Sequence, residues 1–356
     1  MKNISYKTFS WRTHQKNWRM QHINVCQFEM TFGCGLHCRH CYTDCYNIPG
    51  FLTKELNTRE VKFVLDKAYR AGAIWLCLTG GDPLTRKDFL DIYAYAKDKG
   101  FIVTIFTNAY SMTAEIAAYF QKKPPFVIEM TLNAVNQATY EKISRTKGSF
   151  EKVMNGIELI QSKNLPLKIK TQVTKDNWEE VPDIIGFLKK NNMPFRPSYD
   201  LFARLNGDTA PCDLRVPPDK LFKGDSTEHL CDDCQSEALE TNSTRNDYLF
   251  RCAAGGGDGI NIDPYGNAFL CNLIRKPAVN LLESDIAEAF NKLLPLARGR
   301  VFTTDSKCRS CDVRDYCRLC PGRAFVETGD MEAPVEYYCQ LADLAACREP
   351  AANRNS

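Results

Sequence analysis

The feature that most constrains this chain is a short run of thiols, Cys34-Gly-Leu-His-Cys38-Arg-His-Cys41, in which three cysteines lie within eight residues. A single free cysteine usually behaves as a small buried hydrophobic side chain. Three thiols at this spacing instead indicate a soft-metal site, either zinc or an iron–sulfur cluster. Structural zinc usually has four protein ligands. Because no fourth ligand is evident nearby, the pattern favours a four-iron cluster with one iron open to another ligand.

The composition is that of an ordinary globular protein and excludes several classes. Of the 356 residues, 44% are hydrophobic and 25% are charged, and the formal net charge is +3. No basic run indicates nucleic-acid binding, no apolar stretch is long enough to span a bilayer, and residues 1–20 lack the apolar core of a secretory signal. We therefore expect a cytoplasmic protein. In a reducing compartment, the 17 cysteines indicate metal or redox chemistry rather than disulfides.

From residue 23 to residue 199, strand-like and helix-like runs alternate. Strands are expected at 23–32, 74–78, 101–106, 126–132, 167–173 and 195–199, with helices between them at 58–72, 88–99, 113–120, 150–163 and 178–190. Such alternation predicts a parallel sheet. Six units are fewer than the eight of a closed barrel. We therefore predict an α/β fold, a partial (β/α)6 TIM-like barrel that is open on one side.

The composition also suggests how the chain is divided. Residues 1–22 are expected to be a short N-terminal extension and residues 23–203 the barrel. Residues 204–247 are rich in Pro, Asp, Asn, Ser and Thr and are expected to be a linker or insertion. Residues 248–347 are rich in Gly and Cys, with one helix expected at 284–296, and a domain held mainly by metal–thiolate bonds needs less apolar core. Residues 348–356 would be a tail.

The CxxxCxxC spacing of Cys34, Cys38 and Cys41 resembles the cluster motif of the radical SAM superfamily. The resemblance implies that these cysteines hold a [4Fe-4S] cluster and that S-adenosylmethionine (SAM) binds the open iron. It also implies the reaction, in which SAM is cleaved to methionine and a 5′-deoxyadenosyl radical that takes a hydrogen atom from the substrate. Such chemistry requires a low-potential electron donor of the flavodoxin or ferredoxin type.

The same resemblance assigns the SAM contacts. The segment Gly80-Gly81-Asp82-Pro83 resembles the family's GGEP-type segment that binds the methionine amino group, with Asp82 where glutamate is commoner. His40 stands where the family has a residue that packs on adenine. Arg145 lies in a segment resembling the family's IRG region and suits the methionine carboxylate, because a guanidinium pairs well with carboxylates. Taken singly, the glycine segment and Arg145 are more typical of a structural role than a functional one. The predicted set is completed by Asn108, Thr131 and Thr174.

The late cysteines closely resemble the SPASM domain of peptide- and protein-modifying radical SAM enzymes. Family ligand assignments imply two auxiliary iron–sulfur clusters, one held by Cys308, Cys311, Cys317 and Cys339 and the other by Cys252, Cys271 and Cys320. Two departures are the shorter spacing before Cys320 and the lack of a further cysteine soon after Cys252. The second cluster is therefore expected to have an open iron or to borrow Cys347, Cys231 or Cys234. The alternative is a zinc ribbon built from Cys308, Cys311, Cys317 and Cys320.

Several cysteines stay open in their interpretation. Cys231 and Cys234, with Cys212 upstream, are consistent with a cluster ligand, a redox pair, a metal clip or plain exposed thiols. Cys26 and Cys77 lie in strand-like runs and are expected in the core.

The SPASM resemblance implies a radical SAM oxidoreductase acting on a peptide or protein, most often forming a thioether or carbon–carbon crosslink in a ribosomally made peptide. In the sulfatase-activating relatives an aspartate base commonly follows the cysteine that corresponds to Cys271. Here that residue is Asn272, whose amide cannot take a proton, so this reading is disfavoured. The extension of about 22 residues is too short for a peptide-recognition domain, so we expect a separate recognition protein or direct binding to the barrel.

Three alternatives remain at this point: a sulfatase-maturase-like enzyme, an enzyme of small-molecule cofactor biosynthesis, and a non-enzymatic zinc or iron–sulfur module. No catalytic acid or base is assigned from the sequence.

Overall fold

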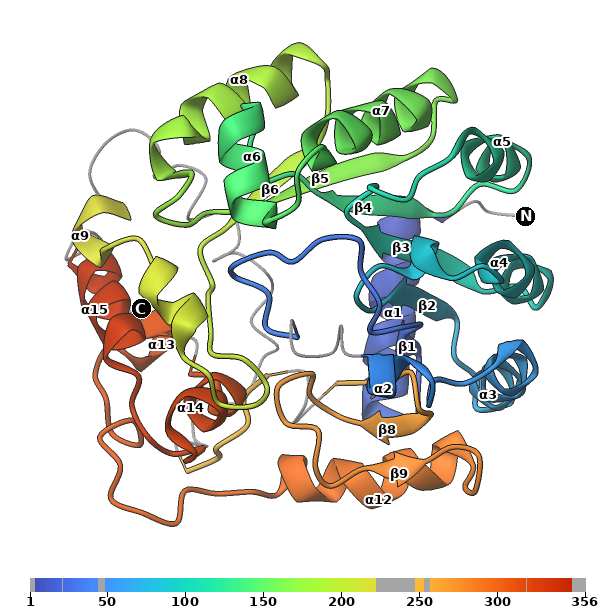
Figure 1. The fold of residues 1–356 in the computed structure, drawn as a ribbon. Coiled ribbons are helices and arrows are strands. Elements are labelled where there is room, and N and C mark those ends of the chain that lie inside the picture. Colours follow the sequence, from blue (N-terminus) through green and yellow to red (C-terminus); the bar gives the residue numbers. More distant parts are fainter. Residues whose placement is uncertain are drawn as a thin grey trace.

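The structure is a computed structural model that describes residues 4–20, 22–43, 49–221, 247–252, 257–317 and 319–347 (Figure 1). The six expected strands form one parallel sheet in chain order, which confirms the predicted partial barrel. They are β1 (Val25–Glu29), β2 (Trp75–Thr79), β3 (Ile102–Thr107), β4 (Val127–Thr131), β5 (Leu167–Gln172) and β6 (Phe195–Ser198).

Helices cover the outer face of this sheet (Figure 1). They are α3 (Thr58–Arg70), α4 (Phe89–Asp98), α5 (Ala114–Lys122), α6 (Gln137–Ser144), α7 (Ser149–Ser162) and α8 (Val181–Lys190), with the short helix η3 (Trp178–Glu180) before α8. Alternate strand residues such as Val103 and Ile105 are fully buried, because successive side chains of a strand point to opposite faces. The other set faces the inside of the barrel, where most of its members are polar.

The Cys-rich region, residues 247–347, continues the barrel sheet. Strand β7 (Gly259–Ile262) pairs parallel to β1, and β8 (Asn267–Phe269) and β9 (Val279–Asn280) follow antiparallel, giving the order β6-β5-β4-β3-β2-β1-β7-β8-β9. The expected helix is present as α12 (Ile286–Arg298), and three further helices are α13 (Arg314–Cys317), α14 (Pro321–Thr328) and α15 (Glu336–Ala346). The strands had no signal in the local sequence, since β7 depends on pairing with a segment more than two hundred residues away.

The N-terminal extension contains helix α1 (Tyr6–Met20), which lies behind β1–β3 in Figure 1. Its Tyr6 hydroxyl accepts a hydrogen bond from the Trp75 indole (2.9 Å), and His14 Nδ1 lies 2.8 Å from the Asp258 carboxylate. Since Trp75 begins β2, α1 packs at the amino ends of the strands, opposite the end where the thiol-bearing loop emerges.

The remaining described elements are short: α2 (Pro49–Leu52), η2 (Pro83–Thr85), η4 (Ala210–Leu214) and α9 (Pro218–Leu221). The last two belong to the expected linker, of which residues 222–246 lie outside the described part, as does the expected tail. None of the helices within the described ranges is both long and apolar enough to cross a lipid bilayer.

A buried ion pair joins the Cys-rich region to the barrel. Arg275 donates two hydrogen bonds of 2.7 Å to the Glu29 carboxylate at the end of β1, and its guanidinium lies against the rings of Phe32 and Phe269. Glu29 is 2% exposed, and its burial raises its pKa against the opposing charge of Arg275. Without Arg275, this carboxyl would be left buried and unpaired.

We therefore expect Arg275→Met to lower the free energy of unfolding by about 3 kcal/mol, the usual cost of removing one partner of a buried pair. Chemical denaturation of the two proteins gives the difference. The matched control is Arg309→Met, which breaks the exposed pair with Asp247 and should cost less than about 1 kcal/mol. Equal losses in the two variants would show that the Glu29–Arg275 contact does not join the two regions.

Candidate functional site

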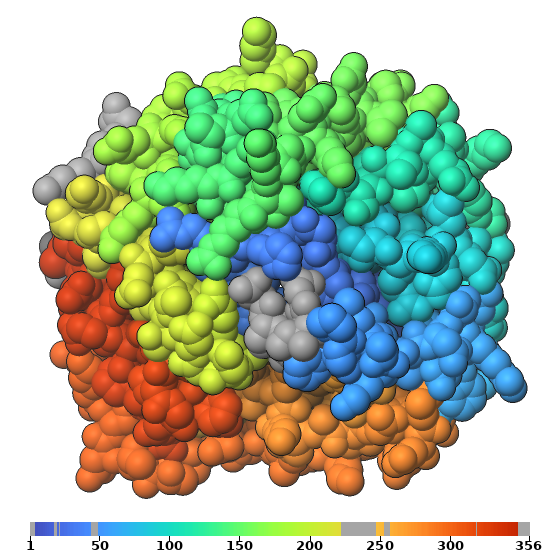
Figure 2. All heavy atoms as spheres, in the orientation of Figure 1, coloured from blue at the N-terminus to red at the C-terminus, as the bar shows by residue number. Residues whose placement is uncertain are grey.

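A cavity of about 490 Å³ lies inside the barrel at the carboxyl ends of its strands. The last residues of four consecutive strands line it, namely Thr79, Thr107, Thr131 and Gln172. Figure 2 shows this face of the molecule, with the blue segment after β1 at the centre, between the green surface around α6 and the orange surface of the Cys-rich region. The cavity therefore lies where α/β barrels carry their chemistry.

The thiol loop, residues 33–41, brings Cys34, Cys38 and Cys41 to this cavity. The backbone amides of His37 and Arg39 donate to the carbonyls of Ser144 and Ile143 at the end of α6 (3.0 and 2.9 Å). These bonds use carbonyl groups that a helix leaves unpaired at its C-terminus. The loop is thus held by backbone contacts and its thiols are left to face the cavity.

The environment of Cys34 suits a metal-bound thiolate. Burial, with a smaller contribution from the charge of Asp82, raises its pKa to about 12, so the bare side chain would stay protonated. The Asn108 amide donates a hydrogen bond to its sulfur (3.3 Å). A bound metal removes the thiol proton, and three such sulfurs beside a cavity fit the iron–sulfur cluster that the spacing predicts.

The glycine loop, residues 79–83, packs directly on the segment before Cys34. The amides of Gly81 and Asp82 donate to the carbonyls of Thr31 and Gly33 (2.7 and 2.8 Å). A Cβ atom at Gly80 would lie 2.2 Å from the Thr31 carbonyl oxygen, and one at Gly81 would lie 2.3 Å from that of Gly33. Both glycines line the cavity and are needed for this close approach of two backbones.

Asp82 ties the glycine loop to the end of β3. Its buried carboxylate accepts hydrogen bonds from the amides of Leu84 and Asn108 (both 2.9 Å) and from the Thr107 hydroxyl (2.8 Å). Burial raises its pKa to about 6 although these hydrogen bonds oppose the shift. Pro83, also buried, is the first residue of η2. Asp82 therefore positions the residues around it, and neither it nor Pro83 is among the described residues that line the cavity.

Of the other predicted SAM contacts, His40, Asn108 and Thr131 line the cavity, whereas Arg145 and Thr174 are not among the described residues that line it. Arg145 is exposed, in the left-handed conformation (φ 50°) that ends α6, immediately after the two carbonyls that hold the thiol loop. Thr174 is buried, with its hydroxyl 3.2 Å from Asn177 Oδ1.

His40 is neutral in these surroundings, since burial lowers its pKa to about 4. Its Nδ1 is buried and lacks a hydrogen-bond partner among the residues described. Buried polar atoms of native proteins are nearly always paired. A polar ligand such as an adenine nucleotide would supply the missing partner.

A second set of cavity-lining residues, called here the amide-rich wall, was not predicted from the sequence. It consists of Gln27 of β1, Glu129 of β4, Lys170 and Gln172 of β5, and Asn272 of the Cys-rich region. Glu129 also lies 3.8 Å from Lys168. The sequence feature that could have revealed this wall is the alternation of side chains along a strand, which places Lys170 and Gln172 on the same inner face of β5. Asn272 has a buried Oδ1 with no hydrogen-bond partner within the described ranges.

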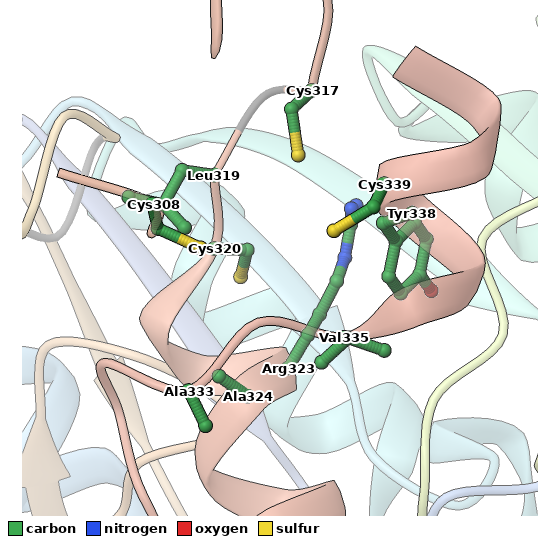
Figure 3. Close-up of a pocket in the computed structure, with 10 residues that line it drawn as sticks. All are labelled: Cys308, Cys317, Leu319, Cys320, Arg323, Ala324, Ala333, Val335, Tyr338 and Cys339. Atoms are coloured by element: carbon green, nitrogen blue, oxygen red, sulfur yellow. The ribbon is translucent and has the colours of Figure 1, made fainter. Parts of the chain in front are cut away.

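The cysteines of the Cys-rich region approach one another in two groups. Cys308, Cys317, Cys320 and Cys339 line a cavity of about 20 Å³. Figure 3 shows the sulfur atoms of Cys308 and Cys339 turned toward one another and that of Cys317 turned toward the space between them. Burial raises the pKa of Cys317 to about 11, and the charges of Cys339, Cys308 and Cys311 add to it.

Cys271 belongs to the second group. Burial raises its pKa to about 11, with smaller contributions from Cys320 and Cys252. In the part of the chain that the structure describes, no three His, Cys, Asp or Glu side chains are arranged to hold a single metal ion. Each cysteine of an iron–sulfur cluster binds a different iron atom, so the two kinds of site require different spacings.

The remaining cysteines differ in their surroundings. Cys26 is fully buried in the core, as expected, whereas Cys77 is half-buried. Cys212 lies in η4 with its thiol 3.7 Å from the Glu327 carboxylate, and Cys347 is exposed. Cys231 and Cys234 fall outside the described residues.

Comparison with known proteins agrees with this geometry. An AdoMet-dependent heme synthase of Methanosarcina barkeri is 26% identical over 339 residues, which cover 88% of this chain and 95% of that protein. Mycofactocin maturase MftC of Mycobacterium ulcerans is 26% identical over 310 residues, which cover 82% of this chain and 80% of that protein.

Among solved structures, Streptococcus suis SuiB bound to its precursor peptide SuiA superimposes with a TM-score of 0.69 at 16% identity, covering 96% of this chain and 82% of that chain. At this identity the likeness shows the fold alone. Residues 28–188 match the sequence family described as the Radical SAM superfamily. The matched residues include the thiol loop, the glycine loop and β2 to β5, so this part of the chain is similar to the radical SAM superfamily.

Proposed function

We propose that this protein uses SAM to modify a ribosomally made peptide, through hydrogen abstraction and formation of a thioether or carbon–carbon crosslink. The observation that carries the proposal is the single cavity shared by the thiol loop, the glycine loop and Asn272 of the Cys-rich region. A cofactor bound to the first two elements would face a substrate bound to the third.

In this proposal Cys34, Cys38 and Cys41 hold the [4Fe-4S] cluster, and Gly80, Gly81 and Asn108 contact SAM together with His40, Thr131 and Arg145. When bound, the cluster and SAM supply a one-electron cleavage that generates the hydrogen-abstracting radical. Asp82 and Pro83 fix the glycine loop, and Thr174 would support the wall near β5. The protein's own part is to orient these groups and to exclude water from the cavity.

The amide-rich wall supports a peptide as the substrate. Gln27, Gln172 and Asn272 each offer an amide donor and an amide acceptor. A peptide backbone presents the complementary N–H and C=O groups, and would supply a donor for the buried Asn272 Oδ1. An apolar substrate would leave the buried Asn272 Oδ1 unpaired, at a cost of about 1–3 kcal/mol.

The Cys-rich region would carry two auxiliary iron–sulfur clusters, one on Cys308, Cys311, Cys317 and Cys339 and the other on Cys252, Cys271 and Cys320. The thiols whose charges act on Cys317 and on Cys271 are those assigned to the same cluster, which supports this assignment. Cys320 lies close to both groups, because it also lines the small cavity with Cys308, Cys317 and Cys339. The proposal includes a cytoplasmic location, a low-potential flavodoxin- or ferredoxin-type donor and, where the peptide does not bind the barrel directly, a separate recognition protein.

A second candidate is a small-molecule enzyme of tetrapyrrole metabolism. It is favoured by the 26% identity to a heme synthase across 88% of this chain. The amide-rich wall favours the peptide instead.

Anaerobic incubation with SAM, a reductant and the short peptides encoded beside the gene distinguishes the two candidates, with heme precursors as the alternative substrates. We expect mass spectrometry to show a peptide that has lost two hydrogen atoms, together with 5′-deoxyadenosine. A changed tetrapyrrole with unchanged peptides would contradict the proposal and establish the second candidate.

Replacing Cys38 with Ala should abolish SAM cleavage while leaving the iron of the auxiliary sites, because the thiol loop holds its own cluster. Iron analysis and 5′-deoxyadenosine release measure the two effects. The control is Cys212→Ala, a thiol that contacts Glu327 outside the cavity, which should retain cleavage. Cleavage in the Cys38 variant would remove this residue from the ligand set.

Asp82 should make the stability of the SAM-free protein depend on pH. Its pKa is about 6 in the folded protein against an ordinary value of 3.8, so between about pH 4 and pH 6 the folded state binds more protons than the unfolded chain. The contribution of Asp82 to stability therefore falls as the pH rises through this window. Asp82→Asn lacks this titration.

Denaturation of both proteins at a series of pH values tests this expectation. The free energy of unfolding of the wild type, minus that of the variant, should decrease from about pH 4 to pH 6 and then level off. A difference that stays constant or increases would show that this carboxyl does not have a raised pKa.

A further inference from the structure

A side chain outside the quoted motifs contacts the thiol loop from the far side. Arg204 is 8% exposed, and its Nε and Nη2 lie 3.3 Å from the carbonyl oxygens of Cys41 and Arg39. The next residue adds a third contact, since the amide of Leu205 donates to the Tyr42 carbonyl (3.0 Å). The buried guanidinium of Arg204 thus binds backbone carbonyls at the third cysteine, Cys41, and two residues before it.

Arg204 belongs to a tight turn, residues 204–208, which fixes its position. The Arg204 amide donates to the Asp208 carbonyl (2.8 Å), and Gly207, at φ +88°, donates to the Arg204 carbonyl (2.9 Å). The Asp208 carboxylate pairs with the Arg204 guanidinium. That carboxylate is 45% exposed whereas the Arg204 side chain is 9% exposed, so water screens the negative charge more than the positive one.

The segment before the turn is anchored independently of the thiol loop. The Leu201 carbonyl accepts hydrogen bonds from the Tyr338 hydroxyl (2.6 Å) and from the guanidinium of Arg215 (2.9 and 2.8 Å). Arg215 in turn pairs with Glu327 of α14. The Cys-rich region therefore holds Arg204 in place against the thiol loop.

Elsewhere at the loop, two partly exposed cations share one buried carboxylate. Arg39 lies 2.5 Å from one oxygen of the Asp176 carboxylate, and Lys142 lies 2.9 Å from the other. Asp176 has an 8% exposed side chain, whereas that of Lys142 is 61% exposed. Arg204 is more deeply buried than these two cations, and its guanidinium contacts the backbone carbonyls of the thiol loop.

We propose that Arg204 is a positioning residue that holds the thiol loop and raises the reduction potential of the cluster bound there. The inference rests on the proposed function, because it requires a cluster on Cys34, Cys38 and Cys41. Reduction adds one electron and makes the cluster more negative, and a nearby buried cation favours that state. The planar fork of arginine suits two carbonyl oxygens at once, which a lysine ammonium contacts less well.

The test is a redox titration of the anaerobic, iron-loaded protein, followed by electron paramagnetic resonance. The signal of the first cluster is identified as the component that Cys38→Ala lacks. The variants are Arg204→Gln, Arg204→Lys and Asp208→Asn. The control is Arg309→Gln, which also removes one arginine charge but at an exposed residue that pairs with Asp247.

Arg204→Gln should lower the equilibrium constant for reduction at least tenfold, which is about 59 mV for one electron. Arg204→Lys, which keeps the charge, should shift it less, and Asp208→Asn should raise the potential. Arg309→Gln should change the equilibrium constant for reduction by less than a factor of three, which corresponds to about half of that 59 mV interval. If Arg204→Gln only loosened the loop, water would enter and stabilise the reduced cluster, and the potential would rise. A fall in the potential therefore indicates the loss of the positive charge rather than a disordered loop.

An unchanged or raised potential in Arg204→Gln would overturn the inference. If Arg204→Gln does not load iron on the thiol loop, the inference is tested with Asp208→Asn instead. A reduction potential that does not rise in Asp208→Asn would overturn the inference. A wild-type protein without the component that depends on Cys38 would instead refute the proposed function.

Discussion

The contact on which the rest of the structure depends is the pair of backbone hydrogen bonds between the glycine loop and the segment leading into the thiol loop. They join the ends of β1 and β2, two adjacent parallel strands. Glycines at positions 80 and 81 allow this approach, because any Cβ there would collide with a carbonyl oxygen. The contact places a cysteine triplet and a turn with exposed backbone on one cavity wall.

The Cys-rich region contributes directly to this site, because its Asn272 lines the same cavity as the thiol loop. Pairing of β7 with β1 extends the barrel sheet, and the Glu29–Arg275 pair fixes the turn that carries Asn272. On the other side, Tyr338 and Arg215 hold the segment that presents Arg204 to the thiol loop. The region that would carry auxiliary clusters therefore also shapes the substrate wall and the environment of the first cluster.

Much of the barrel could be predicted because its signals are local. The strands and helices follow periodicity, and the spacing of Cys34, Cys38 and Cys41 needs no knowledge of the fold. The sequence could not place β7 or the contacts of Arg204, since both depend on segments far apart in the chain. Nor could the sequence distinguish the role of Asp82 from that of the two glycines, because all three belong to one motif. In the structure Asp82 accepts hydrogen bonds from its neighbours, whereas the glycines line the cavity.

The central claim is that the thiol loop and the glycine loop hold a cluster and SAM in one cavity. Electron–nuclear double resonance of the reduced protein with SAM labelled at its methionine nitrogen and carboxyl carbon tests it most directly. The account predicts hyperfine coupling of these labels to the cluster that depends on Cys38. SAM that binds without such coupling, or a reduced cluster indifferent to SAM, would contradict it.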